Sequence, residues 1–293
     1  MSRKHRVHHP FLTFHVVQRG TNKQTIYWDQ QDSNVFLNYL LTDCVRYGAI
    51  VHNYAVMSNH FHLLVTQVKR SALSKVMQNV GSRYVTFVNR KYNRVGALFQ
   101  GRYFASVVQT ESYLLNTMRY IENNPVRAGM ARSLFSATNT SYRTTAHGKP
   151  SPLVIPHPHI RQYGATAEEQ RRFYQEFCRQ PVAEEELYQI RQACRRRVAV
   201  GDRAFSESLE KLTGVPQHST PPGCARGEKK KLYIFDDNEI KQGYSFETEE
   251  RRSFEQELLF MHETQAEAWY EINDRPRLLE RKGVASDALL SER

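Results

Sequence analysis

The chain has 293 residues, which is enough for one good-sized core with additional elements or for two modest domains. Its formal net charge is +11, and no apolar run is long enough to span a bilayer or to act as a secretory signal. The four cysteines are scattered without a C-x-x-C pair, which excludes a zinc knuckle and a disulfide framework. We therefore expect a cytoplasmic protein.

The basic excess is concentrated in the first half of the chain. Residues 1–143 contain 18 Lys and Arg against 5 Asp and Glu, and residues 144–224 contain 11 against 9. Residues 225–293 are acidic, with 12 against 16. A basic surface of this kind suits a polyanion such as nucleic acid, although a basic protein without a specific partner is the alternative.

The first half of the chain alternates predicted strands and helices. Residue patterns predict strands at 11–19, 49–57, 60–66 and 103–108, and helices at 32–47, 73–92 and 111–123. Asp32 and Ser33 can cap the first helix, Gly48 ends it, and Pro125 should stop the last one. The order β-α-β-β-α-β plus a helix predicts an α+β, ferredoxin-like or RRM-like antiparallel sheet. Its two middle strands should form a hairpin, and one face should stay open for a site.

The remainder of the chain is predicted to be helical and then polar. A proline-rich connector at 147–158 precedes helices at 166–178, 184–198 and 204–212. A polar linker at 216–231 leads to an acidic, partly disordered tail with one helix at about 249–269. We divide the chain into a catalytic domain at 9–143, a helical extension at 144–214 that contacts DNA, and a linker with tail at 215–293.

Two histidines at the start of the third predicted strand are candidate metal ligands. His60 and His62 flank Phe61, and strand side chains alternate, so both imidazoles should face the same side. Such a pair can bind a metal ion. The same pattern also occurs as a surface pair or as two core histidines bonded to backbone, so the pair alone does not establish a site.

A tyrosine and an asparagine on the last predicted helix can complete that site. Tyr120 and Asn124 are four residues apart and therefore share one helix face. Glu122 lies elsewhere on the helix and is expected to be a surface or salt-bridge residue. His157 and His159 flank a proline, and we expect them in a solvated turn rather than in a metal site.

Four motifs resemble a known bacterial family. NHFHLL (59–64) resembles the HUH motif, histidine–hydrophobe–histidine, of single-strand DNA endonucleases. RYIENNPVRAG (119–129) resembles the tyrosine-helix signature of the REP-associated tyrosine transposases. HVVQRGTN (15–22) and LFQGRY (98–103) are further matches. The similarity covers residues 11–143 and continues more weakly to about 214; after about 231 the chain resembles no family.

This resemblance implies a reaction and the residues that perform it. His60, His62 and Asn124 would bind a metal ion, and Tyr120 would be the nucleophile that forms a 5′-phosphotyrosine link. A neutral, open site of two imidazoles and one amide suits Mg²⁺ or Mn²⁺ when a phosphate completes it. The implied substrate is single-stranded DNA with a REP-like hairpin, bound by a nucleoid-associated monomer or homodimer. No general base is identified.

Basic and aromatic residues near the motifs are candidate DNA contacts. Phosphates would be bound by Arg19, Lys23, Arg83, Arg90, Lys91, Arg102 and Arg127. Bases could stack on Tyr84, Phe87, Tyr92, Tyr103 and Phe104. For each basic residue the alternative is a solvated surface charge, and for most of the aromatic residues it is a place in the core.

Three other functions are compatible with parts of this pattern. A non-catalytic RRM-like nucleic-acid-binding protein would share the fold, with no joint role for Tyr120 and the two histidines. A zinc hydrolase is disfavoured because no third histidine, cysteine or carboxylate has a suitable spacing to the pair. A rolling-circle initiator or relaxase would share the H-x-H motif but not the tyrosine-helix signature.

Overall fold

A four-stranded antiparallel sheet forms the centre of the computed structural model, which describes residues 6–217 and 249–273. The strands are β1 (Leu12–Arg19), β2 (Ala49–Met57), β3 (His60–Gln67) and β4 (Phe104–Val107). Their spatial order is β2-β3-β1-β4, with β2 and β3 joined as a hairpin. The α+β, ferredoxin-like fold predicted from the sequence is confirmed. Most of the predicted linker at 216–231 lies outside the described residues.

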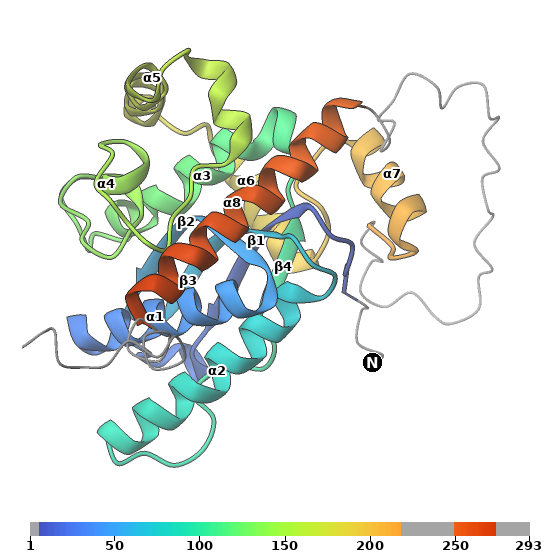
Figure 1. Cartoon of the computed structure of the whole chain (residues 1–293). Helices are drawn as coiled ribbons and strands as arrows, with labels where there is room; N and C mark the ends of the chain where they lie inside the picture. Colours follow the sequence, from blue (N-terminus) through green and yellow to red (C-terminus); the bar gives the residue numbers. More distant parts are fainter. Residues whose placement is uncertain (1–5, 218–248, 274–293) are drawn as a thin grey trace, which may run out of the picture.

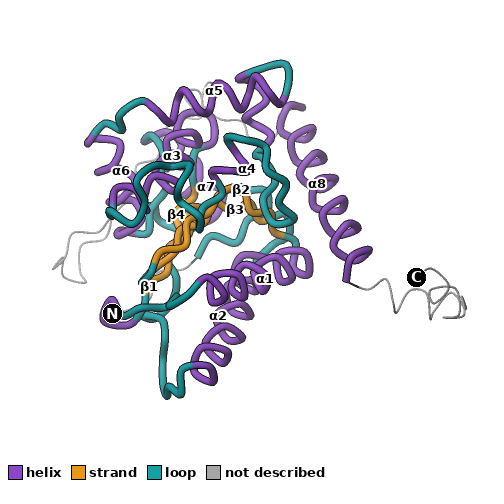
Figure 2. Tube along the Cα trace, turned by 90° about the vertical axis from the view of Figure 1, so that its left-hand side faces the viewer, coloured by secondary structure: helices purple, strands orange, loops and turns teal. Residues whose placement is uncertain are grey.

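Two long helices cover one face of the sheet (Figures 1 and 2). They are α1 (Gln30–Tyr47) and α2 (Ala72–Lys91). Phe36 of α1 and Tyr84 of α2 pack with Phe61 of β3 in one buried apolar cluster. Helix α1 begins two residues before the predicted cap, because Asp29 is the N-cap and Asp32 completes a capping box with it.

The other face is covered by α3 (Thr110–Arg127) together with α4 (Tyr142–Thr145), α5 (Ala167–Arg179) and α6 (Glu184–Arg196) (Figure 2). Helix α7 (Arg203–Thr213) instead buries Phe205 and Leu209 in the apolar cluster of α1 and α2. Two short 3-10 helices are η1 (Thr21–Lys23) and η2 (Pro158–Tyr163). Leu187 and Ile190 of α6 are buried in the same cluster as Tyr120. The expectation of an open sheet face is therefore wrong, because the apolar sides of these helices cover it.

Helix α3 continues through Pro125 to Arg127, where the sequence predicted a stop. A proline inside a helix lacks the N–H that would bond to the carbonyl four residues earlier, here that of Ile121. The side-chain amide of Asn124 donates to the Tyr120 carbonyl at 2.8 Å and lies 3.5 Å from the Ile121 carbonyl. These bonds give the helix the donor that Pro125 removes.

Helix α8 (Glu249–Asn273) packs against α1 and η2. Leu258 is fully buried with Ile50 and Val68. Gln265 Nε2 donates to the Pro152 carbonyl at 2.8 Å, and His262 Nε2 lies 3.4 Å from the Cys44 carbonyl. The predicted helix in the acidic tail is confirmed. None of the helices in residues 6–217 and 249–273 is long and apolar enough to cross a membrane.

Truncation after Gly214 is expected to lower stability but to leave the chemistry intact. Removal of α8 exposes the apolar surface that Leu258 covers, which costs about 2 kcal/mol for one such side chain. Residues 225–293 carry 16 acidic against 12 basic residues, so their loss should also tighten non-specific DNA binding, by less at high salt. A thermal melt, a cleavage assay and DNA titrations measure these effects, and Leu258→Ala isolates the packing part. Loss of cleavage in a truncated protein with a native circular dichroism spectrum would contradict this expectation.

Candidate active site

The two motif histidines lie on one face of β3, as their spacing predicts. The ring centroids of His60 and His62 are 5.0 Å apart, with 74° between the ring planes. Phe61 points to the opposite face, where its ring centroid lies 4.7 Å from that of Phe36. The pair therefore faces α3 and the helical extension rather than α1 and α2.

A third histidine, His15 on β1, belongs to the same cluster. Its Nε2 lies 2.9 Å from Nδ1 of His62, and the two rings are stacked with centroids 5.2 Å apart. His15 is fully buried, and its Nδ1 has no hydrogen-bond partner among the described residues. His15 lies outside the H-x-H motif, and its position in the sequence does not single it out as a member of the site. Strand alternation does put it on one face of β1, but only the pairing of β1 with β3 brings it to His62.

Hydrogen bonds leave one nitrogen of each motif histidine free. Nδ1 of His60 lies 2.6 Å from Oδ1 of Asn59, so it donates to that oxygen and Nε2 keeps its lone pair. Nδ1 of His62 is bonded to His15, which leaves Nε2 of His62 free. Both motif histidines can thus present Nε2 to a ligand, with the other nitrogen held by a neighbour.

The imidazoles are neutral at neutral pH. Burial lowers the pKa of His60 to about 4, and the charge of Arg19 adds to this effect. Burial also lowers the pKa of His15 to about 3. The pKa of His62 is well below its ordinary value because of burial and the neighbouring His15 and His60. Neutral imidazole is the form that binds a metal ion.

Tyr120 lies beside this histidine cluster. Its ring centroid is 5.7 Å from those of both His15 and His62, in edge-on arrangements. The side chain is only 6% exposed, because α6 packs over it. Burial raises the pKa of Tyr120, and Cys194 adds to the rise, whereas Arg191 opposes it by charge and hydrogen bonding. The phenol is therefore protonated at neutral pH.

Asn124 lies one turn after Tyr120 on the same face of α3 and is also buried. Its amide nitrogen is occupied by the helix backbone, so its carbonyl oxygen is the atom left for a ligand. Within the described residues, no group of three or more His, Cys, Asp or Glu side chains is arranged to hold a metal ion. Asn124 offers an amide oxygen, which is a donor of the kind that Mg²⁺ accepts.

Several arginines surround the tyrosine. The Arg127 guanidinium lies 5.5 Å from the Tyr120 ring centroid. Arg191 and Arg195 of α6 lower the pKa of Tyr120, and Arg19 at the end of β1 faces His60 across the strand pair. Sequence reasoning selected Arg19 and Arg127 but missed the two α6 residues, because nothing in their local pattern shows that α6 packs on α3.

The other predicted DNA contacts fall into two groups. Lys23 and Arg102 are exposed, and a bond of 3.4 Å from Asn59 Nδ2 to the Lys23 carbonyl places Lys23 near the histidine end of β3. Arg83, Arg90 and Lys91 lie on α2, which covers the face of the sheet opposite Tyr120. Arg83 is paired with Asp43 at 3.4 Å, and Lys91 with Asp29 at 2.7 Å and Asp32 at 2.8 Å.

The aromatic candidates for base stacking also divide. Tyr84 is fully buried, and its hydroxyl donates to the Ile26 carbonyl at 2.6 Å, so it belongs to the core. Phe87 and Tyr92 pack against the same cluster on the α1 and α2 side. Tyr103 and Phe104 lie instead at the β4 edge of the sheet.

Glu122 is buried, and the expectation of a surface or salt-bridge residue is wrong. Its carboxylate accepts hydrogen bonds from Asn53 at 2.8 Å, Ser141 at 2.5 Å, Thr145 at 2.8 Å and Tyr174 at 2.7 Å. It ties α3 to β2, α4 and α5, which come from distant parts of the chain. This bond network holds the tyrosine helix against the sheet.

Replacing Glu122 by alanine should destabilise the protein by about 3 kcal/mol or more, because four buried donors lose their acceptor. Glu122→Gln keeps one acceptor oxygen and should cost less. Burial raises the pKa of Glu122, so the folded state favours the protonated form. The wild type should therefore lose stability relative to Glu122→Gln as pH rises from about 4.3, the ordinary glutamate value. Urea unfolding at several pH values measures both effects, and an alanine variant as stable as wild type would contradict the first.

His157 is buried, and the prediction of a solvated turn is wrong for it. Its Nε2 lies 3.1 Å from the Thr13 hydroxyl, and its ring packs edge-on against His52, with centroids 4.7 Å apart. The cause is the proline-rich connector, which runs along the edge of the sheet. Ile155 donates its amide to the Val51 carbonyl at 3.0 Å and so brings the following histidine over the sheet.

Comparison with known proteins assigns the domain that carries this cluster. Residues 9–124, which include all of His15, His60, His62, Tyr120 and Asn124, match the family model described as "Transposase IS200 like". This segment belongs to the IS200-like transposase family. The match supports a transposase-type enzyme, as the motifs predict, over a merely RRM-like module.

One solved structure is similar to this protein at the level of the chain trace. It is the structure of a REP-associated tyrosine transposase bound to a REP hairpin, with a TM-score of 0.44 and 11% sequence identity. The similarity covers 50% of this chain and 86% of that chain. No curated protein matches the sequence.

Proposed function

We propose that this transposase nicks and joins single-stranded DNA in a metal-dependent reaction through a 5′-phosphotyrosine on Tyr120. The observation that carries the proposal is the position of the phenol beside the neutral imidazole of His62, which itself lies next to that of His60. A nucleophilic oxygen and a potential divalent-ion site thus share one buried cluster. The structural roles of the neighbouring residues support this assignment.

The donor set fits a hard divalent ion. His60, His62 and Asn124 would hold Mg²⁺ or Mn²⁺, with a DNA phosphate filling further positions. When bound, such an ion polarises the scissile phosphate and orients it. Asn59 and His15 keep the Nδ1 atoms of the two ligand histidines occupied, which directs each Nε2 toward the ligand side.

Tyr120 performs the bond exchange. Its oxygen attacks the phosphorus, a new O–P bond forms, and the bond between phosphorus and the 3′ oxygen breaks. The phenol loses its proton, and the departing 3′ oxygen takes one up. The 5′-phosphotyrosine keeps the energy of the phosphodiester, so a later 3′-hydroxyl can attack it and release the phenol. Arg195 lowers the pKa of Tyr120, and the Arg127 guanidinium lies 5.5 Å from its ring centroid, so both favour the phenolate that this attack requires.

The strand must reach a nucleophile that α6 largely covers. Tyr120 contacts Arg191, Cys194 and Arg195 on that helix by charge or hydrogen bonding. We therefore propose that the DNA enters between α3 and α6 and displaces the Arg191 side chain. The negatively charged DNA phosphates would then pair with the Arg191 guanidinium. The helical extension would therefore be part of the DNA site, as predicted from the sequence.

The substrate proposed is single-stranded DNA with a hairpin of the repetitive extragenic palindromic kind. This part rests on the motifs at 15–22, 59–64, 98–103 and 119–129 and on their resemblance to REP-associated tyrosine transposases. Phosphate contacts would come from exposed residues on the tyrosine side, Arg19, Lys23, Arg102 and Arg127. A protein with these partners would work at the nucleoid as a monomer or homodimer.

Covalent capture tests the proposal. The full chain is incubated with end-labelled single-stranded oligonucleotides that contain palindromes from its own genome, with Mg²⁺ or Mn²⁺. A protein–DNA adduct that withstands denaturing electrophoresis, together with a released strand bearing a 3′-hydroxyl, is the expected result. Tight hairpin binding without adduct in any divalent ion would instead indicate a non-catalytic nucleic-acid-binding protein.

A further inference from the structure

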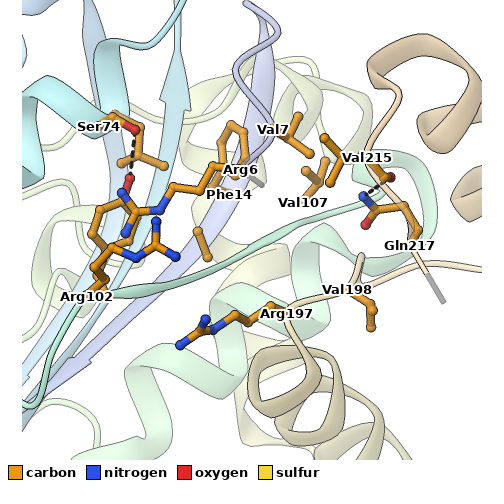
Figure 3. A pocket seen from close by; sticks show the side chains of 13 residues that line it. Arg6, Val7, Phe14, Ser74, Arg102, Val107, Arg197, Val198, Val215 and Gln217 are labelled. Carbon is orange, nitrogen blue, oxygen red and sulfur yellow. Dashed lines mark hydrogen bonds between the residues drawn. The ribbon is translucent and has the colours of Figure 1, made fainter. Parts of the chain in front are cut away.

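Three arginines line a pocket at the β4 edge of the sheet (Figure 3). Arg6 comes from the N-terminal segment, Arg102 from the loop before β4, and Arg197 from the end of α6. Figure 3 shows the side chains of Arg6 and Arg102 close together, with Arg197 across the β4 segment from them. The cavity has a volume of about 40 Å³, enough for a few water-sized spheres. A space of this size suits a small anion such as a phosphate group.

Two aromatic rings position these guanidinium groups. The Arg6 guanidinium carbon lies 3.7 Å from the Tyr103 ring centroid, and that of Arg197 lies 4.8 Å from the Phe104 ring centroid. Stacking on a ring fixes the plane of a guanidinium and leaves its N–H donors at the edge for an acceptor. Such pre-orientation suits the bidentate binding of a phosphate.

No carboxylate neutralises the three arginines within the part of the chain that the structure describes. Burial lowers the pKa of Arg6, and the charges of Arg102 and Arg197 lower it further against the opposing effect of Tyr103. Like charges held this close repel one another, and an anion among them would relieve that repulsion. Arg197 also has a left-handed backbone, with φ of 56°, which is uncommon for a residue with a side chain.

The β4 side chains that line the pocket, Ala105 and Val107, point to the α2 face of the sheet. Arg197 links the pocket to the opposite face, which carries the candidate active site, because its guanidinium lies over the Phe104 ring. Val17 of β1 pairs with His62 on one side and with Phe104 on the other, so all three share one face of the sheet. Phe104 is therefore two strand spacings from His62, about 10 Å. Helix α6 joins the two places, since it carries Arg191 and Arg195 beside Tyr120 and ends at Arg197.

We propose that Arg6, Arg102 and Arg197 form a binding pocket for one backbone phosphate of the single-stranded DNA whose scissile phosphate lies at Tyr120. The inference rests on the proposed function. It adds a site made by the N-terminal segment and the helical extension together. This pocket fixes how far the strand extends from the nucleophile and so selects the phosphate that reaches Tyr120.

Position-specific neutralisation of the DNA tests the pocket. A fluorescent single-stranded oligonucleotide carries one uncharged methylphosphonate linkage, which is moved along the strand, and binding is measured by anisotropy. The protein is the full chain with Tyr120→Phe, so that no cleavage occurs. Arg102→Gln and Arg197→Gln are compared with Arg46→Gln, which removes the same charge from the exposed surface of α1, a helix that does not line the pocket.

We expect each pocket variant to weaken binding about tenfold at moderate salt and to reduce the salt slope by about 0.7, the value for one single-strand phosphate contact. At one linkage of the strand, the methylphosphonate should weaken binding to the parent protein but not to Arg102→Gln or Arg197→Gln. Binding to Arg46→Gln should be weakened by the same methylphosphonate as in the parent protein. Circular dichroism verifies folding, and Arg102→Lys should recover part of the affinity.

Equal effects of the pocket and control variants, or a methylphosphonate profile that the pocket variants leave unchanged, would overturn the inference. The adduct assay separates this result from the proposed function. If the wild type forms the Tyr120 adduct but shows no such coupling, only the pocket assignment fails. If the coupling is present but no adduct forms, the pocket binds DNA and the proposed chemistry fails.

Discussion

Tyr120→Phe is expected to reduce DNA cleavage and adduct formation by about a thousandfold or more while DNA affinity changes by only a few-fold. The substitution removes one oxygen, the proposed nucleophile, and changes no charge. The ring that packs edge-on against His15 and His62 is retained, so the buried cluster keeps its shape. Single-turnover cleavage of a labelled hairpin oligonucleotide and a binding titration measure the two quantities.

Tyr113→Phe is the matched control for this variant. Tyr113 lies on the same helix, α3, and is partly buried, but it is not among the residues that contact the histidine cluster. Its substitution removes an equivalent hydroxyl and should leave cleavage within about twofold. Adduct formation by Tyr120→Phe at the wild-type rate would rule out Tyr120 as the nucleophile.

His60→Ala and His62→Ala are each expected to remove divalent-ion-dependent cleavage, and Asn124→Ala to weaken it. Each histidine offers a neutral Nε2 that nothing else in the cluster occupies, so its loss removes a proposed ligand. Chelation with EDTA should reproduce the histidine variants in the wild type, and added Mg²⁺ or Mn²⁺ should restore activity only there. Cleavage rates across a titration of each ion provide the measurement.

The exposed His147 supplies the control, since His147→Ala changes a histidine in the loop after α4 and should leave the ion titration unaltered. Thermal melts of all variants verify that the buried cluster still folds. Wild-type cleavage that proceeds unchanged in chelator would refute the metal dependence, whatever the variants show.

Local patterns predicted most of the fold and the first members of the site. The residue pattern predicted both ends of β2 correctly. Gly48 ends α1 with a left-handed backbone, as its place in the sequence indicates. The i,i+2 spacing of His60 and His62 and the i,i+4 spacing of Tyr120 and Asn124 define shared faces that depend only on strand and helix geometry. Residue order alone was enough for these features.

Features that depend on contacts between distant segments were missed. His15 reaches His62 only through the register of β1 with β3, and Arg191 reaches Tyr120 only because α6 packs on α3. Glu122 is buried among hydrogen-bond donors that are distant in the sequence. Asn53 precedes it on β2, and Ser141 and Tyr174 follow it by 19 and 52 residues. Pro125 predicted a helix end because proline lacks a backbone N–H. That expectation takes no account of the Asn124 side-chain amide, which bonds to the Tyr120 and Ile121 carbonyls instead.

Peptide mapping of the covalent complex tests the central claim most directly. The full-length wild type is trapped on a hairpin oligonucleotide in Mg²⁺, digested with protease and nuclease, and analysed by tandem mass spectrometry. The proposed function predicts one modified peptide, from the segment 119–127, with a nucleotide attached through its 5′ phosphate to Tyr120. A modification on any other residue, or none in a preparation that cleaves the DNA, would contradict it.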